Sequence, residues 1–300
     1  MGKITFDETD DIIDICQDNV FKAVFTKDSP ESERAMLGFL SQFTGHKISA
    51  ITIVANEPPI DNLRDRQIRF DINCEEDGGR PINVEMTMEP DDFESVRLEF
   101  HVGKLFTGQD IRGKGKTFND LKLTYQISIL VKKILFNDDD IVHCFEYYDP
   151  KRQMSLGGRS RIITVELKKL DKTIEKPVEQ MTEQERWAVF FRYIKDPKKR
   201  QIINQIIEAQ EDIAMAGQVL RTISRDKVER ARLMSEYKFE TDHQSKMVQA
   251  ERRGRAEGEA IGEKRGEKRG QKRGEAIGEN RIIELLKSGK SMEEIIGLYK

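Results

Sequence analysis

Two acidic residues, Asp71 and Glu85, occupy equivalent positions in neighbouring segments that have the pattern of paired strands. In RFDINCEEDGGRPINVEMTM, residues 69–88, apolar and polar residues alternate on both sides of EEDGGR. Alternation with period two on either side of a Gly-rich turn is typical of a β-hairpin. If the hairpin turns symmetrically about Gly78, Asp71 and Glu85 share one face and lie directly opposite each other.

Opposed carboxylates on a hairpin can hold a divalent cation. Their Cβ atoms would be about 5 Å apart, and like charges at that distance destabilise a hairpin. Magnesium is usually bound by one or two carboxylates together with water and substrate phosphate. A bound ion could orient a water molecule and stabilise the charge that develops at a scissile phosphate. The alternative interpretation is an ordinary surface hairpin whose polar face carries acidic residues with no further role.

The segments before the hairpin predict two helices and a strand. Apolar residues recur at helical spacing in DNVFKAVFT, where Asp18 or Asn19 could be the N-cap. A second helix is expected to begin after Ser29, which stands at its N-cap position, and to end near Gly45. The run ISAITIVANE then has the composition of a strand.

The segment after the hairpin returns to helical spacing and is followed by three strand-like runs. The predicted helix lies in PDDFESVRLEFHVGKLFTGQDI. Its expected apolar face consists of Phe93, Val96, Phe100, Leu105 and Phe106. The strand-like runs are LKLTYQISILVKKILF, IVHCFEYYD and SRIITVELKKL. This order of helices and strands predicts a mixed α/β domain that ends near residue 170.

From Met181 onward the chain shows helical patterns alone. In TEQERWAVFFRYIK, Thr182 is the expected N-cap, Glu185 stands at the capping-box position, and Trp187 is the single tryptophan. The helical periods continue through KKRQIINQIIEAQEDIAMAGQVL. These helices could pack on the α/β domain or on one another.

A charged repeat follows, in which glycine recurs at every fourth residue from Gly254 to Gly278. Each glycine costs about 1 kcal/mol of helix stability relative to alanine. We interpret the repeat as a solvated, partly helical spacer. The alternative is a contact surface for self-association, or for nucleic acid through its Lys-Arg pairs. The end of the chain predicts two short helices, with Ser291 capping the second, as a small amphipathic tail.

Composition limits the class of protein. The 300 residues are 37% hydrophobic and 35% charged, with a formal net charge of -3, which suggests a folded part joined to a very polar part. The three cysteines and four histidines are scattered without metal-site spacing, which disfavours a zinc site. No apolar run approaches the ~20 residues of a membrane span, and no signal-peptide pattern is present. We therefore expect a cytoplasmic protein that does not enter a membrane.

Several segments, taken in order, resemble the Rpn family of recombination-promoting nucleases and transposases, within the PD-(D/E)XK nuclease superfamily. They are DNVFKAVFT, LGFLSQFTG, RFDINCEEDGGRPINVEM, FESVRLEFHVGKLFTGQ and ITVELKKL, and the glycine repeat and the SGKSMEEII tail are also similar. The resemblance implies an α/β fold: a PD-(D/E)XK, restriction-endonuclease-like core with a mixed sheet flanked by helices, followed by an all-helical C-terminal region. It also implies a magnesium or manganese cofactor.

The resemblance assigns roles to individual residues. Asp71 matches the aspartate of the strand motif and Glu85 the glutamate of the next motif, both as metal ligands. Thr87 stands where such proteins usually carry glutamine or lysine, so a residue that could act on the attacking water is replaced by a shorter, uncharged one. Asp18 matches an outer metal contact, or it is an ordinary N-cap. Arg97 matches an arginine that contacts phosphate, or it forms a structural salt bridge.

The basic, Gly-rich loop TGQDIRGKGK supplies the remaining candidates. Gln109, Lys114 and Lys116 could contact a DNA backbone, or the loop is simply solvated.

We therefore expect a nuclease-like domain over residues 1–172, a helical region over 173–250, the glycine repeat over 251–280 and a short helical tail over 281–300. The predicted function is a metal-dependent DNA endonuclease associated with recombination or mobile elements, with DNA as its partner and self-association as a further expectation. The alternative is a catalytically weak or inactive relative that binds DNA or a partner protein.

Overall fold

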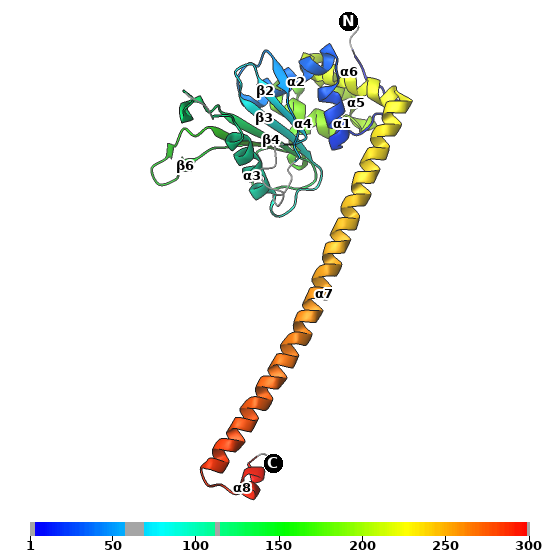
Figure 1. The fold of residues 1–300 in the computed structure, drawn as a ribbon. Helices are drawn as coiled ribbons and strands as arrows, with labels where there is room; N and C mark the ends of the chain where they lie inside the picture. Colours follow the sequence, from blue (N-terminus) through cyan, green and yellow to red (C-terminus); the bar gives the residue numbers. More distant parts are fainter. Residues whose placement is uncertain (1–3, 58–68, 112–114, 299–300) are drawn as a thin grey trace. The chain divides into compact units, whose positions relative to one another are not determined.

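The computed structural model describes residues 4–57, 69–111 and 115–298, and they form two compact units (Figure 1). The first unit is Met1–Tyr237 and the second is Lys238–Lys300. Within the described residues, no helix is long and apolar enough to cross a membrane.

A mixed six-stranded sheet is the centre of the first unit. Its strand order is β1-β2-β3-β4-β8-β5, in which β3, β4 and β8 are parallel and the outer pairs are antiparallel. The strands are β1 (Ile51–Ile53), β2 (Ile72–Glu76), β3 (Pro81–Thr87), β4 (Thr124–Leu130), β5 (Val142–Phe145) and β8 (Ser160–Glu166). A separate two-stranded hairpin, not expected from the sequence, is formed by β6 (Tyr148–Asp149) and β7 (Met154–Ser155).

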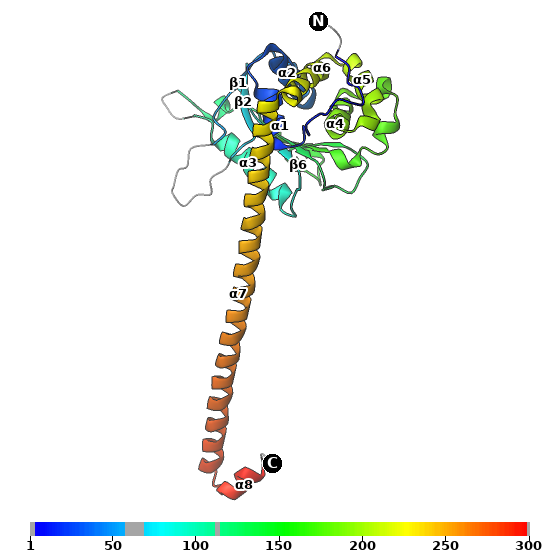
Figure 2. The ribbon, with the colours of Figure 1, turned by 90° about the vertical axis from the view of Figure 1, so that its right-hand side faces the viewer.

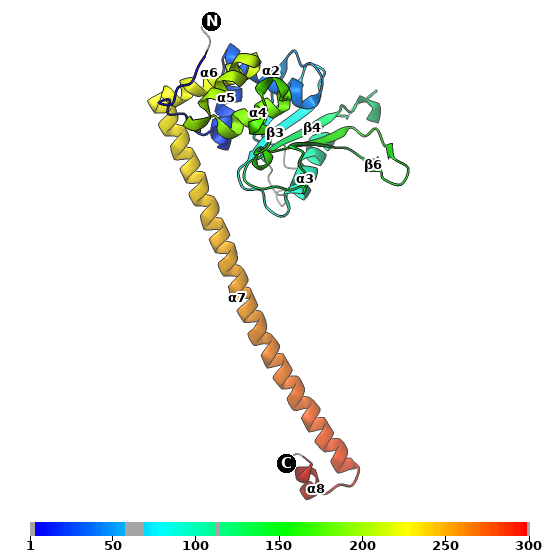
Figure 3. The same cartoon turned by 180° about the vertical axis from the view of Figure 1, so that it is seen from behind.

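Helices cover both faces of this sheet (Figures 1 and 3). Helix α3 (Glu94–Thr107) lies against one face, over β3, β4 and β8. The other face shares an apolar core with helices α1 (Asp18–Thr26), α2 (Pro30–Thr44) and α4 (Glu183–Tyr193). The expected order of elements and the mixed α/β architecture are confirmed.

The helices after the last strand belong to the same compact unit. They include α4, α5 (Arg200–Ala209) and α6 (Glu211–Arg225), and α6 packs along α2. Trp187 of α4 is fully buried, and its ring stacks on Phe191 at 5.3 Å in the core. The first unit therefore extends beyond residue 172, where the sequence suggested a boundary, because these helices complete the apolar core beside the sheet.

The local signals for the first two helices had mixed outcomes. In α2, Ser29 accepts a hydrogen bond from the Ser32 amide and Gly45 ends the helix with φ of 76°, as expected. In α1, the N-cap is Gln17, so the N-cap interpretation of Asp18 and Asn19 is wrong. Asp18 is the first helical residue, where a negative charge interacts favourably with the helix dipole.

The expected apolar face of α3 is only partly correct. Phe93, Val96 and Phe100 are 73%, 60% and 49% exposed, whereas Leu105 is buried as expected. The inner side of α3 combines apolar residues at helical spacing with polar and charged ones, because the helix covers a polar face of the sheet. Its buried residues are Glu94, Leu98, His101, Val102 and Leu105.

The second unit is helical throughout its described elements. Helix α7 (Lys227–Lys287) begins in the first unit and continues without interruption through the glycine repeat (Figure 2). The repeat glycines have open space around them, since a Cβ added at any position from Gly254 to Gly278 would meet no atom within 4 Å. After α7, Ser291 caps the short helix α8 (Met292–Gly297) with a capping box.

Candidate functional site

The hairpin places Asp71 and Glu85 opposite each other, in contact with side chains of α1 and α3. The antiparallel register pairs Ile72 with Val84, so Asp71, one residue before β2, stands opposite Glu85 of β3. One oxygen of Asp71, Oδ2, accepts a hydrogen bond from the Met86 amide at 3.0 Å. The other, Oδ1, lies 3.0 Å from Nζ of Lys22.

Glu85 is almost completely buried, at 3% exposure, and is surrounded by cationic and amide groups. Its Oε1 lies 2.7 Å from Nδ1 of His101 and accepts a hydrogen bond from Asn83 at 2.9 Å. Its Oε2 lies 3.2 Å from Nη1 of Arg97 but makes no hydrogen bond. The surface-hairpin interpretation is therefore wrong, because α3 closes this face of the hairpin.

The environment shifts the pKa values of the two carboxyl groups in opposite directions. Burial raises the pKa of Asp71 above its ordinary value, Lys22 opposes this shift, and the charge of Glu85 adds to it. Burial would also raise the pKa of Glu85, but the neighbouring His101 and Arg97 outweigh it and hold that pKa below its ordinary value. The fold therefore stabilises the charged form of Glu85 and destabilises the charged form of Asp71.

Three basic side chains compensate the like-charge repulsion that the sequence predicted for this pair. Lys22 contacts Asp71, while Arg97 and His101 contact Glu85. Each carboxylate therefore has a cationic neighbour within the protein itself, but the charge of Glu85 still adds to the raised pKa of Asp71, so the predicted repulsion is offset only in part.

Asp71 and Glu85 supply carboxylate oxygens, which are the ligand type that magnesium sites use. Among the residues that the structure describes, no group of three or more His, Cys, Asp or Glu side chains could hold a metal. Magnesium needs fewer protein ligands, because water and substrate phosphate complete its coordination. The buried Glu85 Oε2 makes no hydrogen bond within the described residues and lies 3.2 Å from Arg97 Nη1, so such an ion would share this oxygen with the guanidinium.

The other residues expected around the metal have partners within the protein. Asp18 Oδ2 lies 3.5 Å from Lys22 Nζ, one helical turn away. Thr87 Oγ1 accepts a hydrogen bond from Arg97 Nη2 at 2.8 Å. Arg97 also donates to both carboxylate oxygens of Glu94, at 2.6 and 3.2 Å. The structural salt bridge predicted for Arg97 is thus present, and Arg97 links Thr87 to Glu85.

The loop candidates are not brought to the carboxylate pair by any contact in the described residues. Gln109 bonds to the backbone of Lys122 and to the Thr124 hydroxyl, which ties the end of α3 to the start of β4. Lys116 pairs with Asp110 at 3.4 Å. Lys114 lies outside the described residues.

Two residues of this site, Lys22 and His101, were missed by the sequence analysis. Each stands one helical turn after a residue that was named, Lys22 after Asp18 and His101 after Arg97. Residues four apart on a helix share a face, so this spacing was the signal that could have identified them.

The polar character of the α3-covered face continues beyond Glu85. The strand register places Glu85, Ser128 of β4 and Thr164 of β8 in one row across the sheet. Ser128 and Thr164 are fully buried, and neither hydroxyl makes a hydrogen bond to a residue that the structure describes. Buried polar groups without partners are uncommon in folded proteins, so this row adds unused hydrogen-bonding groups to the face under α3.

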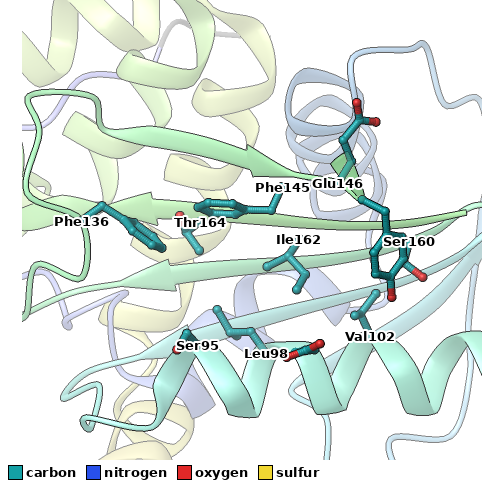
Figure 4. A pocket seen from close by; sticks show the side chains of 11 residues that line it. Ser95, Leu98, Val102, Phe136, Phe145, Glu146, Ser160, Ile162 and Thr164 are labelled. Atoms are coloured by element: carbon teal, nitrogen blue, oxygen red, sulfur yellow. The ribbon is translucent and has the colours of Figure 1, made fainter. Parts of the chain in front are cut away.

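A pocket of about 230 Å³ lies at the far end of this row, between α3 and the β8–β5 edge of the sheet (Figure 4). Thr164 lines its floor, Leu98 and Val102 of α3 form one wall, and the rings of Phe136 and Phe145 form another. Its described lining does not include Asp71, Glu85 or Lys22, so the pocket and the carboxylate pair lie on opposite flanks of α3.

A mixed sheet with an acidic hairpin under a following helix is the architecture of a nuclease core. A family model described as PD-(D/E)XK nuclease family transposase matches residues 15–250, so the chain belongs to this family and has the nuclease fold. The match includes both carboxylates, α1 and α3. No curated protein and no solved structure matches the chain significantly.

Proposed function

We propose that the protein is a metal-dependent DNA endonuclease that acts in recombination or in the movement of mobile elements. The observation that carries the proposal is the buried Asp71–Glu85 pair on the hairpin of a nuclease fold, with one buried Glu85 oxygen free of hydrogen bonds. The transposase description of the family supports the recombination role. DNA is the substrate that this class of fold suggests, and magnesium or manganese is the proposed cofactor.

The residues of the chain would prepare the site in distinct ways. Asp71 and Glu85 would bind the ion, which when bound polarises a phosphate and lowers the pKa of a water molecule. The Met86 amide fixes the Asp71 carboxylate, and His101 with Asn83 fixes that of Glu85. Ligands held in this way need little reorganisation during the reaction, which is the main requirement for electrostatic catalysis.

A second candidate function is supported by the Thr87 position. The Thr87 hydroxyl is engaged by Arg97, and no lysine or glutamine stands at this point of the motif. A protein with this site could bind DNA, or a partner protein, without cleaving it.

A cleavage assay separates the two candidates. Purified protein is incubated with supercoiled DNA in magnesium, manganese, calcium or a chelator, and nicked and linear products are measured. We expect cleavage in magnesium or manganese, and a loss of about a hundredfold or more in Asp71→Asn and Glu85→Gln, since a lost ligand removes several kcal/mol of transition-state stabilisation.

Glu75→Gln is the matched control, because Glu75 is an exposed carboxylate on the same hairpin. It should cleave as the native protein does. DNA binding without cleavage in every metal would instead support the second candidate. Recombinant counts between marked loci in cells, with Asp71→Asn as the comparison, test the proposed role in recombination.

A further inference from the structure

We infer that Lys22, on helix α1, supplies the cation that the nuclease motif lacks at Thr87. This inference rests on the proposed nuclease function. It names the group that would contact the scissile phosphate besides the metal, and it places that group on a different element from the motif.

The motif position itself offers no positive charge. Thr87 is short and uncharged, and its hydroxyl accepts a hydrogen bond from Arg97. Arg97 is in turn engaged by Glu94 and Glu85, so its guanidinium serves mainly to hold these carboxylates. A phosphate at the carboxylate pair would therefore find little free cationic charge on β3 or α3.

Lys22 has a hydrogen-bond donor to spare and lies at the right location. Its Nζ lies 3.0 Å from Asp71 Oδ1 and 3.5 Å from Asp18 Oδ2, and its side chain is 22% exposed. An ammonium group has three donors, so these two contacts leave capacity for a phosphate oxygen. Since Asp71 is a proposed metal ligand, a phosphate bound to that metal would lie beside Lys22.

Helix α1 holds Lys22 in a fixed position. The inner side of α1 is buried in the aromatic core through Phe21 and Phe25, whose rings are 4.8 Å apart. Its two ends are tied to the start of α7 by Asn19, which donates to the Leu233 carbonyl, and by Lys27, which pairs with Glu229 at 2.7 Å. A lysine on a fixed helix can act as a preorganised cation, which is the arrangement that stabilises a transition state.

The reaction that Lys22 would assist is simple hydrolysis. A water oxygen forms a bond to the phosphorus, and the bond between phosphorus and one ester oxygen breaks. The water loses its proton to solvent, and the leaving alkoxide takes up a proton from solvent. Lys22 stays protonated throughout and neutralises the charge that builds up on the non-bridging phosphate oxygens.

The test removes the positive charge at position 22 and then introduces one at position 87. Lys22→Met should lower the single-turnover cleavage rate by about a hundredfold or more, by analogy with the loss of one preorganised donor. Adding Thr87→Lys to this variant returns an ammonium group to the motif position, and it should restore at least about a tenth of the native rate. Lys172→Met is the control, because Lys172 is a surface lysine that is 78% exposed and likewise pairs with an aspartate.

Metal affinity provides a readout that does not depend on cleavage. Manganese binding by calorimetry should be unchanged or tighter in Lys22→Met, because a cation that competes for Asp71 has been removed. If Lys22→Met cleaves at the native rate, or if it loses manganese binding together with cleavage, the inference is wrong and Lys22 is a structural counter-ion. Lys22→Arg, which keeps the charge, serves if Lys22→Met does not fold, and it should retain cleavage.

The two proposals fail in different ways. A native protein that cleaves no DNA in any metal overturns the proposed function, and the role of Lys22 with it. A native protein that cleaves, with a Lys22→Met variant that cleaves equally well, overturns the role of Lys22 alone.

Discussion

The two faces of the central sheet are equally closed to solvent but are built from opposite kinds of side chain. On the side of α1, α2 and α4, Val84, Ile127 and Ile163 stand in register and are at most 2% exposed. One residue further along each strand, Glu85, Ser128 and Thr164 stand in register under α3 and are at most 3% exposed. The alternation of the strands thus separates an apolar core from a buried polar layer.

The difference shows where the fold is stabilised and where it is not. Burying aliphatic side chains contributes about 1.5–3 kcal/mol for each one. Burying a polar group costs free energy unless it finds a partner, and the hydroxyls of Ser128 and Thr164 find none. A fold that retains such a layer beside its two acidic residues sacrifices stability there, which is the pattern expected of a functional surface.

The largest effect on stability should come from the apolar face. Ile127→Ala removes a fully buried side chain from the core, so we expect a loss of about 2–5 kcal/mol in the free energy of unfolding. Denaturant unfolding followed by tryptophan fluorescence measures this, since Trp187 lies in the same core. A loss below about 1 kcal/mol would show that this face is not the main source of stability.

On the polar face, Glu85→Gln should be destabilising, and the effect should depend on pH. The pKa of Glu85 is held below its ordinary value by His101 and Arg97 against the effect of burial, so its charged form favours the folded state. This contribution is complete above the unfolded pKa of about 4.3 and is lost as the pH falls through the lower folded pKa.

The melting temperatures of the native protein and of Glu85→Gln are measured in a chelator from pH 3 to pH 7, in steps of about one pH unit. The native protein should be the more stable of the two near neutral pH, and the difference should shrink below about pH 4.3. A difference that does not change with pH would mean that the ion pairs of Glu85 do not stabilise the fold.

The apolar face of the sheet was predicted well from the sequence, because alternating apolar residues in a strand indicate directly which side is buried. The hairpin register, the order of helices and strands along the chain, and the helix α2 with its Ser29 and Gly45 boundaries all followed from local patterns. The same patterns placed Asp71 and Glu85 opposite each other, as the structure does. These features depend on residues that are close in sequence or that alternate regularly.

The polar layer could not be predicted in this way, because its partners come from separate elements. Lys22 reaches Asp71 from α1, and His101 reaches Glu85 from a helix whose exposed side carries Phe93 and Phe100. A rule that turns apolar residues inward therefore failed for Phe93 and Phe100, although Leu98, Val102 and Leu105 follow it. The pairing that Glu85 requires on burial accounts for the inward positions of Arg97 and His101.

Asp71→Asn should have a smaller effect on stability, and of opposite sign. Burial raises the pKa of Asp71 and Glu85 adds to this, so at neutral pH its charged form disfavours the folded state despite Lys22. The variant should therefore be as stable as the native protein or slightly more stable near neutral pH, in a chelator. The difference should disappear as the pH falls through the raised folded pKa and below the unfolded value of about 3.9, where the native carboxyl is also neutral.

The comparison of Asp71→Asn with Glu85→Gln is the informative measurement. Both variants are expected to lose cleavage, but melting curves in the absence of metal should separate them. If both lose stability equally at neutral pH, the two carboxylates have the same structural role, and the distinction drawn between them from their neighbours would be incorrect.

The smallest effect on stability is expected for Ser128→Ala. Ser128 follows Ile127 on β4 and faces the other side of the sheet. The Ser128 hydroxyl is fully buried and makes no hydrogen bond, so its removal also removes the cost of desolvating it. We expect a free energy of unfolding equal to that of the native protein or up to about 1 kcal/mol higher, from the midpoint of denaturant unfolding. Ile127→Ala is the matched control, because it shortens a side chain at the adjacent position of the same strand. A Ser128→Ala variant that loses more than about 1 kcal/mol would show that this hydroxyl is paired in solution, and that the polar face stabilises the fold as the apolar face does.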